Sequence, residues 1–319
     1  MRRRNFTAWL CGVAAFPRAA LAQPRTGIPV IGYLIPGNPE PVFGYFKEGL
    51  RILGYIEGRN IQIEFRSADG KPERLAALAA GLVGIKVDIL VAAQTPAITA
   101  AKRATGQIPI VMAGSGDPVA TGLIASLARP GGNITGMSGT TTEMGAKTLE
   151  LVREVLPQAK RVAVLANATD PFTKPFLDQL HRAGRLLALE IAPIMIKQTA
   201  EFGAAFQDMI KRRTDAVVVQ PSLQRRIAAE MALQHALPAV SPQGPFPDEG
   251  GLMSYSAKVA DIHREAAVYV DKILKGARPA DLPVQQPTKF ELGVNLRVAK
   301  ALGIKFPQSV LLRADKVIE

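Results

Sequence analysis

The sequence predicts an α/β protein built from two doubly wound, Rossmann-like lobes, which are joined by a hinge and separated by a ligand cleft. Three observations lead to this prediction. The chain has 319 residues, a length that favours two domains. Short apolar runs alternate along it with segments of helical periodicity, which is typical of mostly parallel sheets. This alternation restarts after Thr140 and gives two βαβ series of similar size.

The first 22 residues are predicted to be a cleaved secretory signal peptide. Residues 1–4 are a basic start, residues 6–16 are mostly apolar, and Ala20-Leu21-Ala22 is an A-x-A cleavage site. Arg3-Arg4 also fits the core of a twin-arginine signal, so both Sec and twin-arginine export are open. We therefore expect an exported protein that does not span the membrane.

Removal of this leader changes the charge and the chemistry of the chain. The full chain carries a net charge of +12, and the leader contains four arginines and no acid, which leaves +8. The leader also contains Cys11 and Trp9, each the only residue of its type, so thiol chemistry is excluded. An exported protein meets little nucleic acid, and the remaining Lys and Arg are scattered. We therefore expect no nucleic-acid partner.

The first series begins with a buried strand at residues 28–35, which Pro36-Gly37 ends. Apolar residues at helical spacing between Val42 and Leu53 predict a helix, which Gly54 stops. Residues 61–66 alternate as a half-buried strand, and Pro72 opens the next helix. The series continues with a strand at 87–92, a helix at 96–104 and strands at 108–112 and 134–137.

The second series repeats this pattern. Helices are predicted through 149–155 and at 171–183, 202–210 and 227–235, and strands at 161–165, 189–196, 216–219, 238–240 and 252–255. A long helix at 259–274, a strand at 290–294 and a helix at 296–302 complete the chain. Lobe 1 is then predicted to comprise residues 23–138 and 255–284, and lobe 2 residues 139–254 and 285–319.

The loops that follow the strands define the predicted site, because ligands of parallel sheets bind at the carboxyl ends of the strands. These loops are small, polar and mostly uncharged, which suits hydrogen bonding to a small ligand better than acid–base catalysis. The candidate ligand-binding residues are Asn38, Gln94, Thr95, Ser115, Asp117, Asn167, Gln220, Ser222 and Tyr255.

Thr95-Pro96 is the most informative of these positions. Threonine is a good N-cap and proline suits the first helical position. Such a helix start presents free amide groups to the cleft and attracts a carboxylate or phosphate, although simple capping accounts for the same pair.

Other candidates have two interpretations each. A helix cap is the first interpretation, and a ligand contact the second, for Asp117-Pro118 and Asp170-Pro171. Either a turn cap or a ligand contact is consistent with Asn38 and Asn167. Tyr255 lies at a crossover between the lobes, where its ring either lines the cleft or packs against the hinge.

Sequence signatures of an enzyme are poor. Gly114-x-Gly116 lacks the later glycine of a dinucleotide fingerprint, and no P-loop, zinc-protease or nucleophile-elbow motif occurs. His181, His235 and His263 lie in separate helical segments and are interpreted as surface or half-buried helix residues. We expect neither an enzyme nor a bound cofactor or metal.

Several segments match a known family over nearly all of the mature chain. They are residues 49–61 (GLRILGYIEGRNI), 87–92, 117–119, 126–136, 250–255, 269–276, 286–292 and 299–303. On these motifs the chain resembles the ABC-transporter substrate-binding proteins whose characterised branch binds tryptophan or tyrosine, with the type I periplasmic binding-protein fold.

The resemblance implies a soluble receptor that delivers a small solute to a membrane permease. Residues 94–96 are similar to the family's site for the ligand carboxylate, and the loops at Asp117, Asn167 and Gln220 would supply further contacts. Gln94 stands where the family usually has glycine, and the segment 220–224 looks shorter than in many members. Ser241-Pro242-Gln243 offers no acid to an ammonium group, which argues against an α-amino acid ligand.

The leading function is therefore a periplasmic solute receptor of an ABC importer, with a small ligand that bears a carboxylate and resembles an aromatic amino acid. The expected partners are this solute and the ABC permease subunits, and the receptor itself is expected to be a monomer. Two alternatives stay open: a sensory ligand-binding module of the same fold, and an isomerase or hydrolase in the cleft. A repressor is excluded, because a signal peptide stands where a helix-turn-helix would be.

Overall fold

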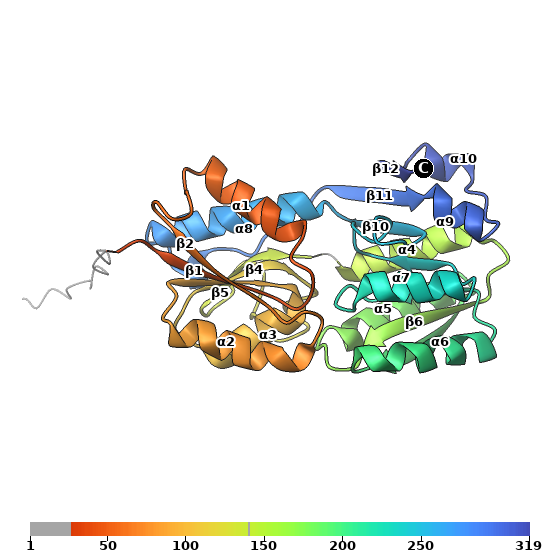
Figure 1. Ribbon diagram of the computed structural model, residues 1–319, viewed down its shortest axis with the longest axis horizontal. Coiled ribbons are helices and arrows are strands. Elements are labelled where there is room, and N and C mark those ends of the chain that lie inside the picture. Colours follow the sequence, from red (N-terminus) through yellow and green to blue (C-terminus); the bar gives the residue numbers. More distant parts are fainter. Residues whose placement is uncertain (1–26, 140) are drawn as a thin grey trace, which may run out of the picture.

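Two separate sheets, each flanked by helices, form two lobes that lie side by side along the long axis of the molecule (Figure 1). The computed structural model describes residues 27–139 and 141–319. The predicted signal peptide, with Cys11 and Trp9, lies outside the described residues. Within them, the predicted α/β fold with two mostly parallel sheets is confirmed.

Lobe 1 contains a five-stranded, fully parallel sheet in the order β2-β1-β3-β4-β5. Its strands are β1 (Val30–Ile35), β2 (Gln62–Ser67), β3 (Ile89–Ala93), β4 (Ile110–Ser115) and β5 (Ile134–Ser138). Its helices are α1 (Val42–Ile52), α2 (Leu75–Gly84), α3 (Gln94–Ala104) and α8 (Val259–Leu274). Successive strand side chains point to opposite faces, so Tyr33 packs under α1 and α8, whereas Leu34 packs against α2 and α3.

Lobe 2 contains a seven-stranded sheet in the order β12-β11-β10-β9-β8-β6-β7, in which only the β10–β11 pairing is antiparallel. Its strands are β6 (Arg161–Asn167), β7 (Glu190–Ile196), β8 (Ala216–Val219), β9 (Ala239–Ser241), β10 (Met253–Ala257), β11 (Phe290–Asn295) and β12 (Lys316–Ile318). The helices α4 (Thr141–Val155), α5 (Thr173–Leu186), α9 (Leu296–Ala301) and α10 (Gln308–Leu311) share one core, and α6 (Phe202–Lys211) and α7 (Arg225–Gln234) share the other.

The last two elements, α10 and β12, are absent from the sequence-based prediction. They contain four and three residues, which is too short for apolar periodicity to show. Their positions depend instead on tertiary contacts, since Val310 is buried in the core of lobe 2 and β12 pairs with β11.

The described segments connect the lobes at three places: from β5 to α4 across residue 140, from β10 to α8 at Lys258, and from residue 285 to β11. The sequence-based prediction starts the second segment of lobe 1 at residue 255. The pairing of β10 with β11 in the sheet of lobe 2 continues to Ala257, two residues further. After the crossing, α8 packs against α1, where a Cβ on Gly49 would lie 2.9 Å from the Cβ of Ala267. In the described part of the chain, no helix is long and apolar enough to cross a membrane.

Candidate functional site

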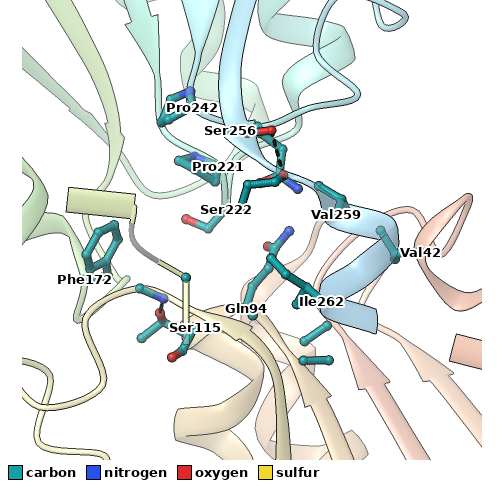
Figure 2. A pocket seen from close by; sticks show the side chains of 18 of the residues that line it. Val42, Gln94, Ser115, Phe172, Pro221, Ser222, Pro242, Ser256, Val259 and Ile262 are labelled. Atoms are coloured by element: carbon teal, nitrogen blue, oxygen red, sulfur yellow. Dashed lines mark hydrogen bonds between the residues drawn. The ribbon is translucent and has the colours of Figure 1, made fainter. Parts of the chain in front are cut away.

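The carboxyl ends of the parallel strands of both lobes meet around one cavity. Its walls come from the ends of β1, β3 and β4 in lobe 1, from the loops after β6, β8 and β9 in lobe 2, and from the crossover into α8. In Figure 2, Gln94 and Ser222 approach the cavity from opposite lobes, and Val42, Val259 and Ile262 form an apolar wall on one side. The cavity therefore lies where the doubly wound topology predicts a ligand site.

The start of α3 contributes backbone amides to this cavity. The helix begins at Gln94, whose φ of +67° lies in the left-handed region, and this turn directs the chain sharply from β3 into α3. Thr95 is therefore not the N-cap that the sequence predicts: its Oγ1 accepts a hydrogen bond from the Gly116 N–H (3.0 Å). Pro96 consequently occupies the third helical position. The amides of Gln94 and Thr95 belong to the first turn, in which N–H groups have no acceptor within the helix.

Lobe 1 also contributes a buried hydroxyl and a close contact with lobe 2. The Ser115 side chain is 1% exposed, and its Oγ has no hydrogen-bond partner among the residues that the structure describes. At the next residue, a Cβ on Gly116 would lie 2.3 Å from the Phe172 ring. Glycine is thus required there for the loop after β6 to lie against lobe 1.

Lobe 2 contributes a buried carboxylate, Asp170. Its Oδ2 accepts from Gln220 Nε2 (3.0 Å) and its Oδ1 from the Phe172 N–H (2.9 Å). Gln220 is held in turn, because its Oε1 accepts from the Asn167 N–H and from Thr173 Oγ1. Burial raises the pKa of Asp170, while the Phe172 amide and the nearby Ser222 hydroxyl oppose this rise. Every one of these donors is neutral.

The crossover helix α8 places an imidazole in the cavity wall. His263 is 4% exposed, and its Nδ1 lies 3.1 Å from the hydroxyl of Tyr33 on β1. Burial lowers the pKa of His263 to about 3, so the ring is neutral at physiological pH. The interpretation of His263 as a surface or half-buried helix residue is wrong, because α8 packs its buried face onto the sheet of lobe 1.

A hydrogen bond joins the two lobes at the rim of the cleft. A groove beside the cavity is lined by the Pro36–Val42 loop and by residues 222–226. There Gln224, just before α7, donates from Nε2 to the carbonyl of Gly70 in lobe 1 (3.1 Å) and to Thr199 Oγ1 (2.8 Å). Next to it, Arg225 forms a bidentate ion pair with Glu249 and donates to the Pro221 carbonyl, which holds the loop after β8.

The structure brings five of the nine predicted site residues to the cavity: Gln94, Thr95, Ser115, Gln220 and Ser222. The other four lie nearby with partners of their own. Asn38 and Asp117 accept from backbone amides in their own turns, at Glu40 and at Val119 and Ala120, and Asn167 accepts from Thr169. Tyr255 stacks on Phe290 in the adjacent strand, with 5.9 Å between ring centroids.

Sequence reasoning missed several cavity residues. The position of Asp170 after β6 favours a helix cap over a ligand contact, so Asp170 is not among the predicted site residues. Phe172, Met144 and His263 give no sequence signal, because only the tertiary packing of the loop after β6 and of the helices α4 and α8 brings them to the cavity. No cluster of three or more metal-ligating side chains is found within residues 27–139 and 141–319.

Comparison with known proteins identifies the family. The family of ABC transporter substrate binding proteins matches residues 39–318, most of the chain. The chain belongs to this family. It is a family of solute-binding proteins and not of enzymes, and the two lobes have the type I periplasmic binding-protein fold.

Similar proteins agree with this assignment. A protein of Clostridioides difficile, named as a tyrosine-binding protein, is 29% identical over 267 residues, which cover 82% of this chain and 76% of that protein. A Streptococcus pneumoniae domain crystallised in complex with L-Trp is 25% identical, with a TM-score of 0.84 and coverage of 92% of this chain and all of that one. A conserved domain protein of Vibrio cholerae is 26% identical, also with a TM-score of 0.84, over 91% of this substrate-binding protein and all of its own chain.

Proposed function

We propose that this protein is the periplasmic receptor of an ABC importer, and that its ligand is an aromatic α-amino acid, which it captures in the interlobe cavity and delivers to the permease. The observation that carries this proposal is the pairing of two groups from different lobes: the start of α3 in lobe 1 and the buried carboxylate of Asp170 in lobe 2. An α-amino acid presents complementary groups to both.

The start of α3 suits the ligand carboxylate. The first amides of a helix lack intrahelical acceptors, and the helix dipole makes this end electropositive. The amides of Gln94 and Thr95 are available for an anion, whereas Pro96 has no N–H. Ser115 Oγ, buried at the cavity without a partner among the described residues, is a further donor.

Asp170 suits the ligand ammonium group. A buried carboxylate is unfavourable unless a cation compensates it, and the hydrogen-bond donors that reach the Asp170 carboxylate are neutral amides, from Gln220 and Phe172. A ligand ammonium group would supply the missing charge. The acid that is lacking at residues 241–243 is thus available from the loop after β6.

The remaining wall suits an aromatic side chain. Val42, Val259 and Ile262 gather on one side of the cavity (Figure 2), and Met144 and Phe172 add further apolar surface. The names of two relatives agree with such a ligand, since one is a tyrosine-binding protein and the other contains L-Trp. Contacts between the lobes at Gly116 and Gly70 support a closed conformation, as expected for the form that encloses a ligand.

Titration calorimetry on residues 23–319 tests the proposal. We expect tyrosine, tryptophan or phenylalanine to bind, and the matching amine and acid, which each lack one charged group, to bind far more weakly. Asp170→Asn should weaken binding by about 2–5 kcal/mol, the usual effect of removing one partner of a buried charge pair. The control is Asp178→Asn on the exposed face of α5, where the carboxylate pairs with Lys174.

Two outcomes would refute the ligand assignment: the wild-type protein binds no amino acid at millimolar concentration, or Asp170→Asn binds as tightly as Asp178→Asn. The transport role has its own test. Deletion of the gene should abolish uptake of the radiolabelled ligand by cells, and unchanged uptake would favour the sensory alternative.

A further inference from the structure

The buried pair of Tyr33 and His263 contains one polar atom with no protein partner. The two side chains come from β1 and α8, and the imidazole lines the cavity. His263 Nδ1 contacts the Tyr33 hydroxyl at 3.1 Å. His263 Nε2 has no hydrogen-bond partner in the described ranges 27–139 and 141–319, so it is the atom that is left for a ligand.

The surroundings of Tyr33 determine which nitrogen carries the proton. The tyrosine is fully buried beneath the rings of Phe43, Phe46 and Phe65, at centroid distances of 5.0, 5.1 and 6.1 Å. Burial, with the charge of Glu40, raises the pKa of Tyr33, so the phenol keeps its hydrogen. Nδ1 is the only acceptor for that hydrogen among the described residues, and a buried donor without an acceptor is strongly unfavourable.

Tyr33 must therefore donate to Nδ1, and the proton of the neutral imidazole then resides on Nε2. This assignment follows from the hydrogen-bond network. It makes His263 Nε2–H a fixed donor: Nε2 can accept a hydrogen bond only if the imidazole changes tautomer, which would leave the Tyr33 hydrogen unpaired.

We infer that His263 selects ligands whose side chain ends in a hydrogen-bond acceptor, and that the receptor therefore prefers tyrosine to tryptophan and phenylalanine. This inference rests on the proposed function, because it assumes that the α-amino and α-carboxylate groups are held by Asp170 and the start of α3. The phenol oxygen of tyrosine accepts from Nε2–H. An indole can only donate, so tryptophan would oppose two donors, and phenylalanine would leave Nε2–H unpaired.

The first test measures ligand selectivity in the wild-type protein. Titration calorimetry should show that tyrosine binds at least about tenfold more tightly than phenylalanine or tryptophan. Histidine-directed ¹⁵N NMR should place the proton of His263 on Nε2, both with and without ligand. Equal affinities for the three amino acids, or a proton on Nδ1, would overturn the inference.

Substitutions separate this inference from the proposed function. His263→Leu should abolish the preference for tyrosine over phenylalanine. Tyr33→Phe removes the group that fixes the tautomer, so discrimination against tryptophan should relax while tyrosine still binds. The control is His181→Gln on α5, whose Nδ1 contacts the Leu177 carbonyl.

The outcomes are distinguishable. If the wild-type protein binds none of the three amino acids, the proposed function itself is wrong. If it binds them without preference, or if His263→Leu keeps the preference for tyrosine, only the role of His263 is wrong. The wild-type selectivity and the NMR measurement need no variant, so a misfolded variant would not prevent the test.

Discussion

On the proposed function, a ligand enclosed between the lobes leaves only when they separate, and Gln224 opposes this separation at the rim of the cleft. Its Nε2 donates to the Gly70 carbonyl of the other lobe at 3.1 Å. One such hydrogen bond contributes about 0.5–1.5 kcal/mol, which corresponds to about 2- to 12-fold in the equilibrium between open and closed forms. Gln224→Ala should therefore raise the ligand Kd by about this factor, mainly through faster dissociation, as measured by stopped flow and calorimetry.

A disulfide at the same place gives a stronger test. A Cβ on Gly70 would lie 2.7 Å from Cγ of Gln224, so the two Cβ atoms would be at most about 4.2 Å apart, below the upper limit for native disulfides. Residues 23–319 contain no cysteine of their own. Oxidised Gly70→Cys/Gln224→Cys, loaded with ligand beforehand, should release it at least about tenfold more slowly, and a reductant should reverse this. Because Gly70 has a φ of +73°, the reduced variant should lose about 1–2 kcal/mol of stability.

Two results would refute this reasoning. One is a Gln224→Ala variant whose dissociation rate equals that of Gln207→Ala, an exposed glutamine on α6. The other is a crosslinked protein that exchanges ligand as fast as the reduced one, because this would show that release does not require the cleft rim to open.

Three further predictions concern the same cleft. Gly116→Ala should weaken ligand binding at least about tenfold without unfolding either lobe. The new Cβ would lie 2.3 Å from the Phe172 ring, so the two lobes could no longer approach each other as closely. Unchanged affinity in calorimetry would contradict this. Burial raises the folded pKa of Asp170 above its unfolded value, so the ligand-free protein should lose stability as the pH rises through that interval. An ammonium ligand needs the carboxylate, so its affinity should fall as the pH drops through the raised pKa, and Asp170→Asn should lack this dependence in titrations from pH 4 to 8. Arg225→Met leaves the Glu249 carboxylate without its partner at a place where both side chains are about 15% exposed. It should lower the free energy of unfolding by about 3 kcal/mol, measured as a drop of several degrees in Tm. The double variant Arg225→Met/Glu249→Leu should recover most of this stability, and no recovery would show that the pair contributes more than compensation of charge.

Apolar periodicity predicts most of this fold because the core of each lobe is built from whole strands and helices. Residues 259–274 show this well: the helix predicted from the spacing has the bounds that are observed. The shorter elements escape prediction, since the burial of Val310 and the pairing of β12 depend on neighbours that are far away in sequence.

The candidate site was less predictable, for a different physical reason. Residue type and strand-end position select Gln94, Ser115 and Gln220, because topology alone brings strand ends together. They cannot distinguish a ligand contact from a turn cap, and the short side chains of Asn38 and Asp117 are used by their own backbone.

Lobe 1 is completed by a segment that the ribosome makes late. Helix α8, residues 259–274, covers one face of the first sheet and packs closely on Gly49 of α1. Until the chain has been synthesised beyond Leu274, the core under that helix, including Tyr33, stays open to water. Although domains often fold in order during synthesis, the N-terminal lobe here can complete its core only after more than four-fifths of the chain has been synthesised. The nascent protein thus stays incompletely folded throughout most of translation, and an amino-terminal fragment cannot reach the native structure of even its own lobe.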